Sequence, residues 1–201
     1  MDKDAHIRKF DKQAKKYEKL QKKDPTARFR KRIIPDADGK TLEVAIGTGL
    51  NLPYYRNVTE LTGIDFSSEM LNAASKITHS YPFEINLEQA DVETIHFEKN
   101  SFDTIVSSLS FCSYENPVQI LNRFQRWSKP DGKVLMLEHG KSTNRMLRGI
   151  QRGIDPLAYK MIGCHQQRDI IGFVDESQLE VLKVERALAG LIYFIWARPQ
   201  K

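Results

Sequence analysis

The sequence predicts a doubly wound α/β domain whose seven strands form a mostly parallel sheet, with helices on both faces. Short, nearly all-apolar segments alternate along residues 41–138 with segments whose apolar residues recur every three or four positions. The first pattern is typical of buried strands, and the second is typical of amphipathic helices. Strands without polar alternation fit a sheet that is covered on both sides. The 201 residues are enough for one such domain and too few for two.

The first expected element is an amphipathic helix at residues 5–23, with mostly charged residues between its apolar positions. The apolar positions are Ile7, Phe10, Ala14, Tyr17 and Leu20. Pro25 ends the helix, and a turn follows at residues 36–39. An apolar stripe of this kind must pack on something, so we expect residues 1–34 to form an N-terminal helical lid on the sheet domain.

Five strands are expected next, at residues 41–46, 61–64, 83–89, 102–109 and 133–138. Ser67 or Ser68 can cap a helix after the second of these strands. Asn116, followed by a proline, opens another helix after the fourth. The turn at residues 129–132 leads into the fifth strand.

The last third of the chain breaks this rhythm. Residues 139–166 are basic and contain several glycines, and we expect them to be an insertion. A helix is expected at residues 168–177, and strands at 179–187 and 191–198 follow it as an antiparallel pair at the sheet edge. The whole chain is therefore interpreted as one domain, in which residues 139–201 supply a substrate insertion and the sheet edge.

Composition narrows the class of protein. The hydrophobic fraction is 40% and the charged fraction 28%, which is a globular profile. We see no stretch near the ~20 apolar residues of a membrane span, and no signal peptide. The two cysteines, Cys112 and Cys164, predict neither a disulfide framework nor a cysteine-rich metal site. A reducing, cytoplasmic environment is expected from these features.

Charge is unevenly distributed. Residues 1–32 hold 13 Lys or Arg and five Asp or Glu, whereas the rest hold 18 and 21. A second basic cluster, in which Asp155 is the one acid, consists of Lys141, Arg145, Arg148, Arg152, Lys160 and Arg168. Such patches attract acidic substrates, anionic lipid or nucleic acid. A solvated surface is the commoner meaning of a Lys-rich helix.

The segment with the clearest chemistry is the turn Gly47-Thr-Gly49 after the first strand. Glycine allows a sharp turn and lets a ligand lie against the backbone, whose N–H groups face its polar atoms. Asp65 ends the second strand, where an acid can accept both hydroxyls of a ribose or simply cap the next helix. Asp91 follows the third strand and could accept from an adenine amino group.

Other nucleotide sites fit less well. The dinucleotide pattern G-x-G-x-x-G has Leu52 at its last position here. We find neither the Gly-Lys-Ser/Thr of a phosphate-binding loop nor the G-x-S-x-G of hydrolases.

Five segments, in order over residues 10–138, resemble class I S-adenosylmethionine-dependent methyltransferases. Residues 43–49 are similar to the first signature, E-x-G-x-G-x-G, with Ala45 in place of its first glycine. Residues 61–71 and 90–103 resemble the second and third signatures, and residues 127–132 the turn before the fifth strand. Residues 10–18 resemble the N-terminal helix motif of quinone-type C-methyltransferases. The resemblance implies a Rossmann-like fold that binds S-adenosylmethionine, with residues 35–138 as the cofactor-binding half.

The same resemblance implies roles for individual residues. The implied cofactor-binding residues are Tyr17, Glu43, Ala45, Gly47, Gly49, Asn51, Asp65, Phe66, Met70, Asp91, Val92, Ser107 and Ser108. Glu43, Gly47 and Gly49 would shape the methionine pocket. Ser107 or Ser108 would line the end of that pocket. Asp65 would hold the ribose, Met70 would pack on the adenine and Asp91 would bind its amino group. Tyr17 would close over the cofactor, with a core aromatic in the helix stripe as the equal alternative.

Methyl transfer from a sulfonium mainly requires a nucleophile in line with the C–S bond, and such positioning contributes about 7–11 kcal/mol. A general base is needed only if the nucleophile must lose a proton. His139 and His165, which bracket the irregular segment, are the candidates. Their alternative role is to support the lid through hydrogen bonds. No metal site is expected, because no His, Cys or Glu grouping has a zinc-like spacing.

Two short stretches, residues 138–139 and 163–169, resemble small-molecule thiol methyltransferases and bacterial phospholipid N-methyltransferases. This favours a small or lipid-like acceptor, and makes nucleic acid an unlikely one. The basic N-terminal helix could also contact an anionic membrane. The competing hypotheses are a non-catalytic cofactor-binding module and a nucleic-acid-binding protein. The oligomeric state is not predicted.

Overall fold

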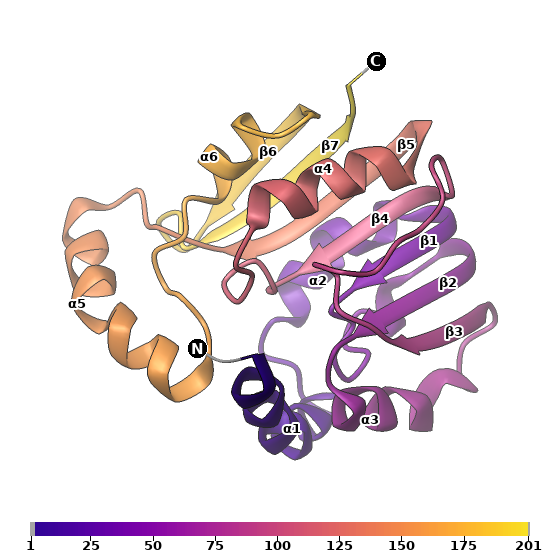
Figure 1. Ribbon diagram of the computed structural model, residues 1–201, viewed down its shortest axis with the longest axis horizontal. Coiled ribbons are helices and arrows are strands. Elements are labelled where there is room, and N and C mark those ends of the chain that lie inside the picture. The colour runs from indigo at the N-terminus through magenta and orange to yellow at the C-terminus, as the bar shows by residue number, and fades with distance from the viewer. Residues whose placement is uncertain (1–2, 201) are drawn as a thin grey trace.

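The computed structural model describes residues 3–200, and its seven strands form one sheet in the order β3-β2-β1-β4-β5-β7-β6 (Figure 1). The strands are β1 (Asp38–Val44), β2 (Asn57–Asp65), β3 (Glu84–Gln89), β4 (Phe102–Ser108), β5 (Ser128–His139), β6 (Leu179–Ala187) and β7 (Ile192–Pro199). Strands β1 to β5 pair in parallel, whereas β7 runs antiparallel to both β5 and β6. The predicted fold class, with an antiparallel last strand, is confirmed.

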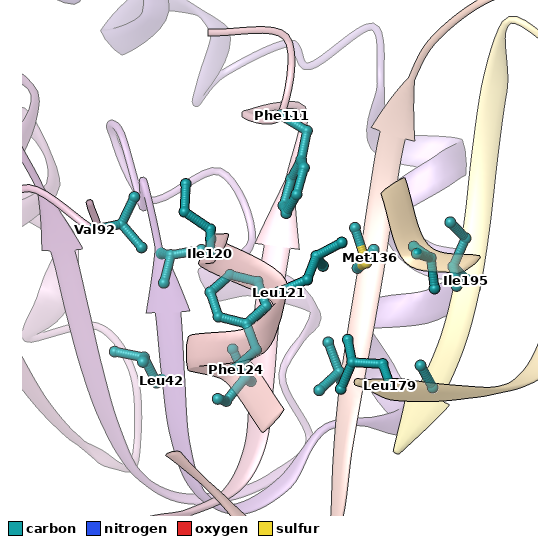
Figure 2. Packing of buried hydrophobic residues seen from close by; sticks show 14 of the residues in the cluster. Leu42, Val92, Phe111, Ile120, Leu121, Phe124, Met136, Leu179 and Ile195 are labelled. Atoms are coloured by element: carbon teal, nitrogen blue, oxygen red, sulfur yellow. The ribbon is translucent and has the colours of Figure 1, made fainter. Parts of the chain in front are cut away.

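Helices cover both faces of this sheet. The helices of the described residues are α1 (Lys3–Leu20), α2 (Ala27–Ile33), α3 (Ser68–Thr78), α4 (Pro117–Trp127), α5 (Arg145–Ile162) and α6 (Ile170–Asp175), of which α5 does not lie on the sheet (Figure 1), and short 3-10 turns occupy Ile34–Asp36 and Leu52–Tyr54. Helices α4 and α6 pack on one face, where Leu121, Phe124 and Met136 belong to one buried cluster (Figure 2). A second cluster, with residues of α2 and α3, fills the other face. A sheet covered on both sides explains the apolar strands.

Local signals place the helices around the site. The Ser67 hydroxyl accepts a hydrogen bond from the backbone N–H of Met70 at 3.2 Å, so the predicted cap begins α3. Pro117 occupies the first turn of α4, where its missing N–H costs no helical hydrogen bond. Helix α3 therefore starts just beyond the carboxyl end of β2, whereas α4 starts after a loop, residues 109–116, that follows β4.

The structure differs from the sequence-based elements at the expected turn of residues 129–132, which lies within β5, and in two longer segments. Helix α2 lies between Pro25 and the expected turn at residues 36–39, a segment for which no separate helix was expected. Residues 145–162 of the expected irregular insertion form an 18-residue helix, α5, which Asn144 caps and Gly163, at a φ of 76°, ends. Glycines and a proline within α5 had hidden its helical spacing. No helix within residues 3–200 has the length and apolar character needed to cross a membrane.

Candidate functional site

A cavity of about 510 Å³ opens at the carboxyl ends of β1, β2 and β4. Its walls come from the turn after β1, the strand ends, α1, α3, α5 and the loop before β7. The strand order reverses between β1 and β4, which is where open α/β sheets bind ligands. The volume lies within the range of small-molecule sites.

The turn after β1 forms the floor of this cavity. Ala45, Gly47 and Gly49 all have left-handed backbones, with φ of 50°, 57° and 79°. A Cβ added to Gly47 would have no neighbour nearer than 4.0 Å, so this glycine leaves its side of the cavity empty. A Cβ on Gly49 would lie 2.8 Å from Leu52 Cδ1, so the second glycine permits close packing and does not line the cavity. Ala45 lines the cavity in a conformation that costs a non-glycine residue about 1 kcal/mol, which explains the glycine of the related motif.

Asp65 ties this turn to the end of β2. Its Oδ2 accepts the N–H of Gly47 and its Oδ1 the N–H of Ser67, both at 2.9 Å. The carboxyl is 7% exposed and lines the cavity, and burial raises its pKa to about 6. Each oxygen keeps a second lone pair, so the group can still accept two hydroxyls.

A buried network supports the cavity from below. The Tyr55 hydroxyl donates to Glu43 Oε2 at 2.7 Å, and Asn51 Nδ2 donates to Glu43 Oε1 at 2.8 Å. Arg30 donates to Asn51 Oδ1 at 2.6 Å and forms an ion pair with Asp24 at 2.9 Å. Burial raises the pKa of Glu43 to about 7. Glu43 lines the cavity, whereas Asn51 orients it from outside.

Arg30 was missed by sequence reasoning, although it is buried and lines the cavity. It lies within the basic N-terminal run, and nothing in the spacing separates it from the solvated lysines around it.

The structure brings only some of the residues expected at the adenine end into the cavity. Phe66 and Met70 line it. Asp91 lies in an adjoining pocket of about 170 Å³, which Phe66 shares, and forms an ion pair with Lys3 of α1 at 2.6 Å. Val92 is part of the hydrophobic core. Helix α1 thus closes the region around Asp91, while Tyr17 lines the main cavity further along the same helix.

The two serines at the end of β4 have different surroundings. Ser108 lines the cavity and accepts from Asn51 Nδ2 at 3.0 Å. Ser107 is buried and donates to Glu138 Oε1 at 2.7 Å. Glu138 Oε2 also accepts the backbone N–H groups of Ser110 and Phe111, and burial raises the pKa of this carboxyl to about 7. Glu138, which sequence reasoning did not assign to the site, therefore holds the loop after β4 in shape.

His139 and the two cysteines meet at the far end of the cavity. The sequence predicted no disulfide framework, but the structure joins Cys112 to Cys164 in one disulfide. All three side chains line the cavity, and His139 Nε2 lies 3.1 Å from Cys164 Sγ. Their ligand atoms lie within 4.8 Å of one another, a grouping that the spacing did not reveal. In a disulfide, however, the sulfurs are not the thiolates that bind metals. Burial lowers the pKa of His139, which favours the neutral imidazole.

His165 is not among the residues that line the cavity. Its Nδ1 lies 2.8 Å from Asp155 Oδ2, and its ring stacks on Tyr159 with 4.1 Å between centroids. These contacts attach the end of α5 to the segment that follows it. Of the two candidate bases, only His139 faces the space where an acceptor could lie.

Comparisons with known proteins find similarity to methyltransferases. A family model described as a methyltransferase domain matches residues 42–136. The mitochondrial methyltransferase OMS1 of Saccharomyces cerevisiae is 28% identical over 84% of this chain and 40% of its own length. The phosphatidylethanolamine N-methyltransferase of Cereibacter sphaeroides is 28% identical over 78% of each chain. The ubiquinone/menaquinone biosynthesis C-methyltransferase UbiE of Bdellovibrio bacteriovorus is 33% identical over 56% of this chain and 51% of its own.

The chain therefore spans only about half, or less, of the length of two of these three relatives. Among solved structures, an S-adenosylmethionine dependent methyltransferase from Mesorhizobium loti has a TM-score of 0.65 and 16% identity. The alignment covers 87% of this chain and 96% of that one. This last likeness concerns the fold alone.

Proposed function

We propose that this chain, which carries an S-adenosylmethionine-dependent methyltransferase domain, transfers a methyl group to a lipid-like or other small acceptor held beside His139. The observation that carries the proposal is a single cavity that extends from Asp65 at the sheet edge to His139. One end offers acceptors for hydroxyl groups. The cavity also has an apolar part of its lining, from Leu109, Ile162, Leu188, Leu191 and Ile192. Polar side chains, among them Ser110, Gln151 and Gln166, line it as well.

The residues of the first end fit the cofactor. Gly47 leaves open space on its cavity side, which a ligand can fill. Thr48 lines the same cavity, and its buried Oγ1 has no hydrogen-bond partner within the described residues. A buried polar atom of this kind requires a partner, which a bound polar ligand supplies. Asp65 would accept the ribose hydroxyls, and Glu43 would lie near the charged methionine end.

The bound cofactor supplies a methyl group that is already activated on a sulfonium. The protein then has to exclude water and align the acceptor, which contributes about 7–11 kcal/mol to lowering the barrier. His139 in its neutral form can take a proton from an acceptor that carries one. The names of two relatives, which denote methylation of phosphatidylethanolamine and of quinone precursors, support a lipid-like acceptor.

A labelled-methyl assay over phosphatidylethanolamine, a long-chain quinol, a small thiol and a small amine tests the proposal. We expect the highest turnover with an acceptor that has an apolar tail, and lower turnover with its short-chain analogue. Cofactor binding without transfer to any acceptor would instead favour the non-catalytic hypothesis.

The role of His139 predicts a specific kinetic change. His139→Gln should lower kcat by about 10²–10⁴-fold with an acceptor that must lose a proton, and should leave cofactor affinity unchanged. His79→Gln, at an exposed position after α3, is the matched control and should behave as the wild type. If both variants keep full kcat, His139 is not the base.

The raised pKa values of Asp65 and Glu43 predict how cofactor affinity depends on pH. Hydroxyl and ammonium groups of the ligand bind best to ionised carboxylates. Because burial raises the pKa of Asp65 to about 6 and that of Glu43 to about 7, each carboxyl group must lose its proton before it binds the ligand at a pH below its pKa. Calorimetry with S-adenosylhomocysteine should give a Kd that is constant above about pH 8. Below the pKa of each carboxyl group, the Kd should rise by up to about tenfold for every pH unit and for each of the two groups. The Glu43→Gln variant should retain only the transition near pH 6. A flat profile between pH 5 and 8 would contradict these assignments.

A further inference from the structure

Helix α5 carries its apolar side chains on the outside. Met146, Ile150, Ile154, Leu157 and Met161 are between 48% and 76% exposed. At 100° per residue these five positions lie within about 80° of one another around the helix. Six of the eight large exposed hydrophobic side chains of the described residues belong to α5, so the stripe is a local feature.

The inner face of the same helix is held by polar contacts. Gln151 Nε2 donates to the backbone carbonyl of Gly140 at 2.9 Å, and Gln151 Oε1 accepts from Ser142 N at 2.8 Å. Asp155 binds the His165 ring, and Tyr159 stacks on it. A helix that only packs on its own domain has the reverse arrangement, with its apolar face inward. Figure 1 shows α5 projecting away from the sheet.

The charge of α5 complements an anionic surface. Arg145, Arg148, Arg152 and Lys160 are exposed on the same helix. At 100° per residue, Lys160 lies about 80° from the middle of the stripe, and the three arginines lie about 140–160° from it, on the polar side of the helix. Its one acid, Asp155, is buried against His165. A helix with an apolar face and a polar face rich in arginine and lysine is the kind that lies in the interface of anionic bilayers.

The carboxyl end of α5 also reaches the cavity. Ile162, which is 43% exposed, lines the cavity and directly follows Met161 at the end of the stripe. Helix α1 adjoins this end, where His6 Nε2 lies 3.1 Å from the Gly163 carbonyl oxygen. A molecule whose tail remains in the bilayer could therefore reach the cavity along the end of α5.

We propose that α5 docks the protein on an anionic lipid bilayer, with its apolar stripe inserted and its basic residues at the lipid headgroups. This surface lies on α5, whereas the sequence pointed to the N-terminal helix. The docking does not depend on which acceptor is methylated, because vesicle binding is measured without methyl transfer.

Vesicle flotation with phosphatidylcholine, alone or mixed with phosphatidylglycerol, tests the proposal. The protein should bind the mixed vesicles. Leu157→Ser should weaken binding by about tenfold or more, since burial of one leucine contributes about 1.5–3 kcal/mol. Leu182→Ser on β6, where the leucine is similarly exposed, is the matched control and should bind as the wild type.

A second pair of variants tests the charge. The double variant Arg145→Gln/Arg152→Gln should bind mixed vesicles about 20-fold more weakly and lose its preference over neutral ones. Arg56→Gln/Lys99→Gln removes the same charge at the amino ends of β2 and β4, opposite the cavity, and should change little.

Three results would overturn the proposal. The first is a wild type that does not bind mixed vesicles. The second is equal loss of binding in the α5 variants and their controls. The third is a wild type that sediments as a dimer and becomes a monomer on Leu157→Ser without any vesicle binding, which would assign the stripe to a second copy of the chain.

Discussion

The Asp65→Ala variant should bind S-adenosylhomocysteine at least about 100-fold more weakly than the wild type. Hydrogen bonds to a charged group contribute about 1.5–3 kcal/mol each, and the proposed ribose contact has two. The carboxylate also accepts the N–H groups of Gly47 and Ser67, so its loss leaves both without these partners and loosens the cavity floor. Titration calorimetry measures the effect, and circular dichroism checks that the variant is folded.

Asp91→Ala is the informative comparison. Asp65 ends β2 and Asp91 follows β3 at the same edge of the sheet, but Asp91 lies in the adjoining pocket and pairs with Lys3. We expect its removal to weaken binding clearly less than removal of Asp65. A folded Asp65→Ala protein with wild-type affinity would contradict the ribose assignment. A larger loss from Asp91→Ala would mean that the adenosyl group is held mainly in the adjoining pocket.

The parallel core could be predicted because its local signals agree with one another. The central strands contain buried apolar runs, such as Ile105-Val106 in β4 and residues 134–137 in β5. The turns between strands and helices contain a glycine, a proline or a cap, as at Gly47, Pro117 and Ser67. In parallel strands the carboxyl ends share one edge, so Asp65 could be assigned to the same rim as the glycine turn. In the structure, Asp65 and the glycine turn lie at the same rim, and a hydrogen bond of 2.9 Å joins Asp65 to Gly47.

Other parts of the site depend on tertiary contacts that spacing does not reveal. Arg30 is buried because α2 lies beside the network below the cavity, where Arg30 donates a hydrogen bond to Asn51. Glu138 looks like the end of an apolar strand until the loop after β4 folds onto it. For α5, Gly149, Gly153 and Pro156 lower the intrinsic helix propensity, and the helix forms despite them. The apolar stripe of α5 also faces outward, whereas the apolar face of a helix usually packs on its own domain.

The pairing of Cys112 with Cys164 is the least local of these features, and it leads to the second large effect. The two residues are 52 positions apart. A disulfide that closes a loop of this length stabilises the folded chain by roughly 4 kcal/mol through the entropy of the unfolded state. That is a large fraction of the about 5–15 kcal/mol that separates a typical domain from its unfolded state. Reduction should therefore lower the free energy of unfolding by about 2–4 kcal/mol.

Urea denaturation with and without dithiothreitol measures this difference. The double variant Cys112→Ser/Cys164→Ser should unfold at the lower urea concentration under both conditions, which shows that the reductant acts through this bond alone. The disulfide joins the loop after β4 to the segment that follows α5, so its loss should also free the end of α5 next to His139. Proteolysis near Gly163 should then be faster in the reduced wild type than in the oxidised wild type. In the double variant, the cleavage rate should be the same with and without dithiothreitol. If reduction changes neither the urea midpoint nor the cleavage rate, the bond constrains neither the fold nor α5, and attachment of that helix would rest on Gln151 and Asp155.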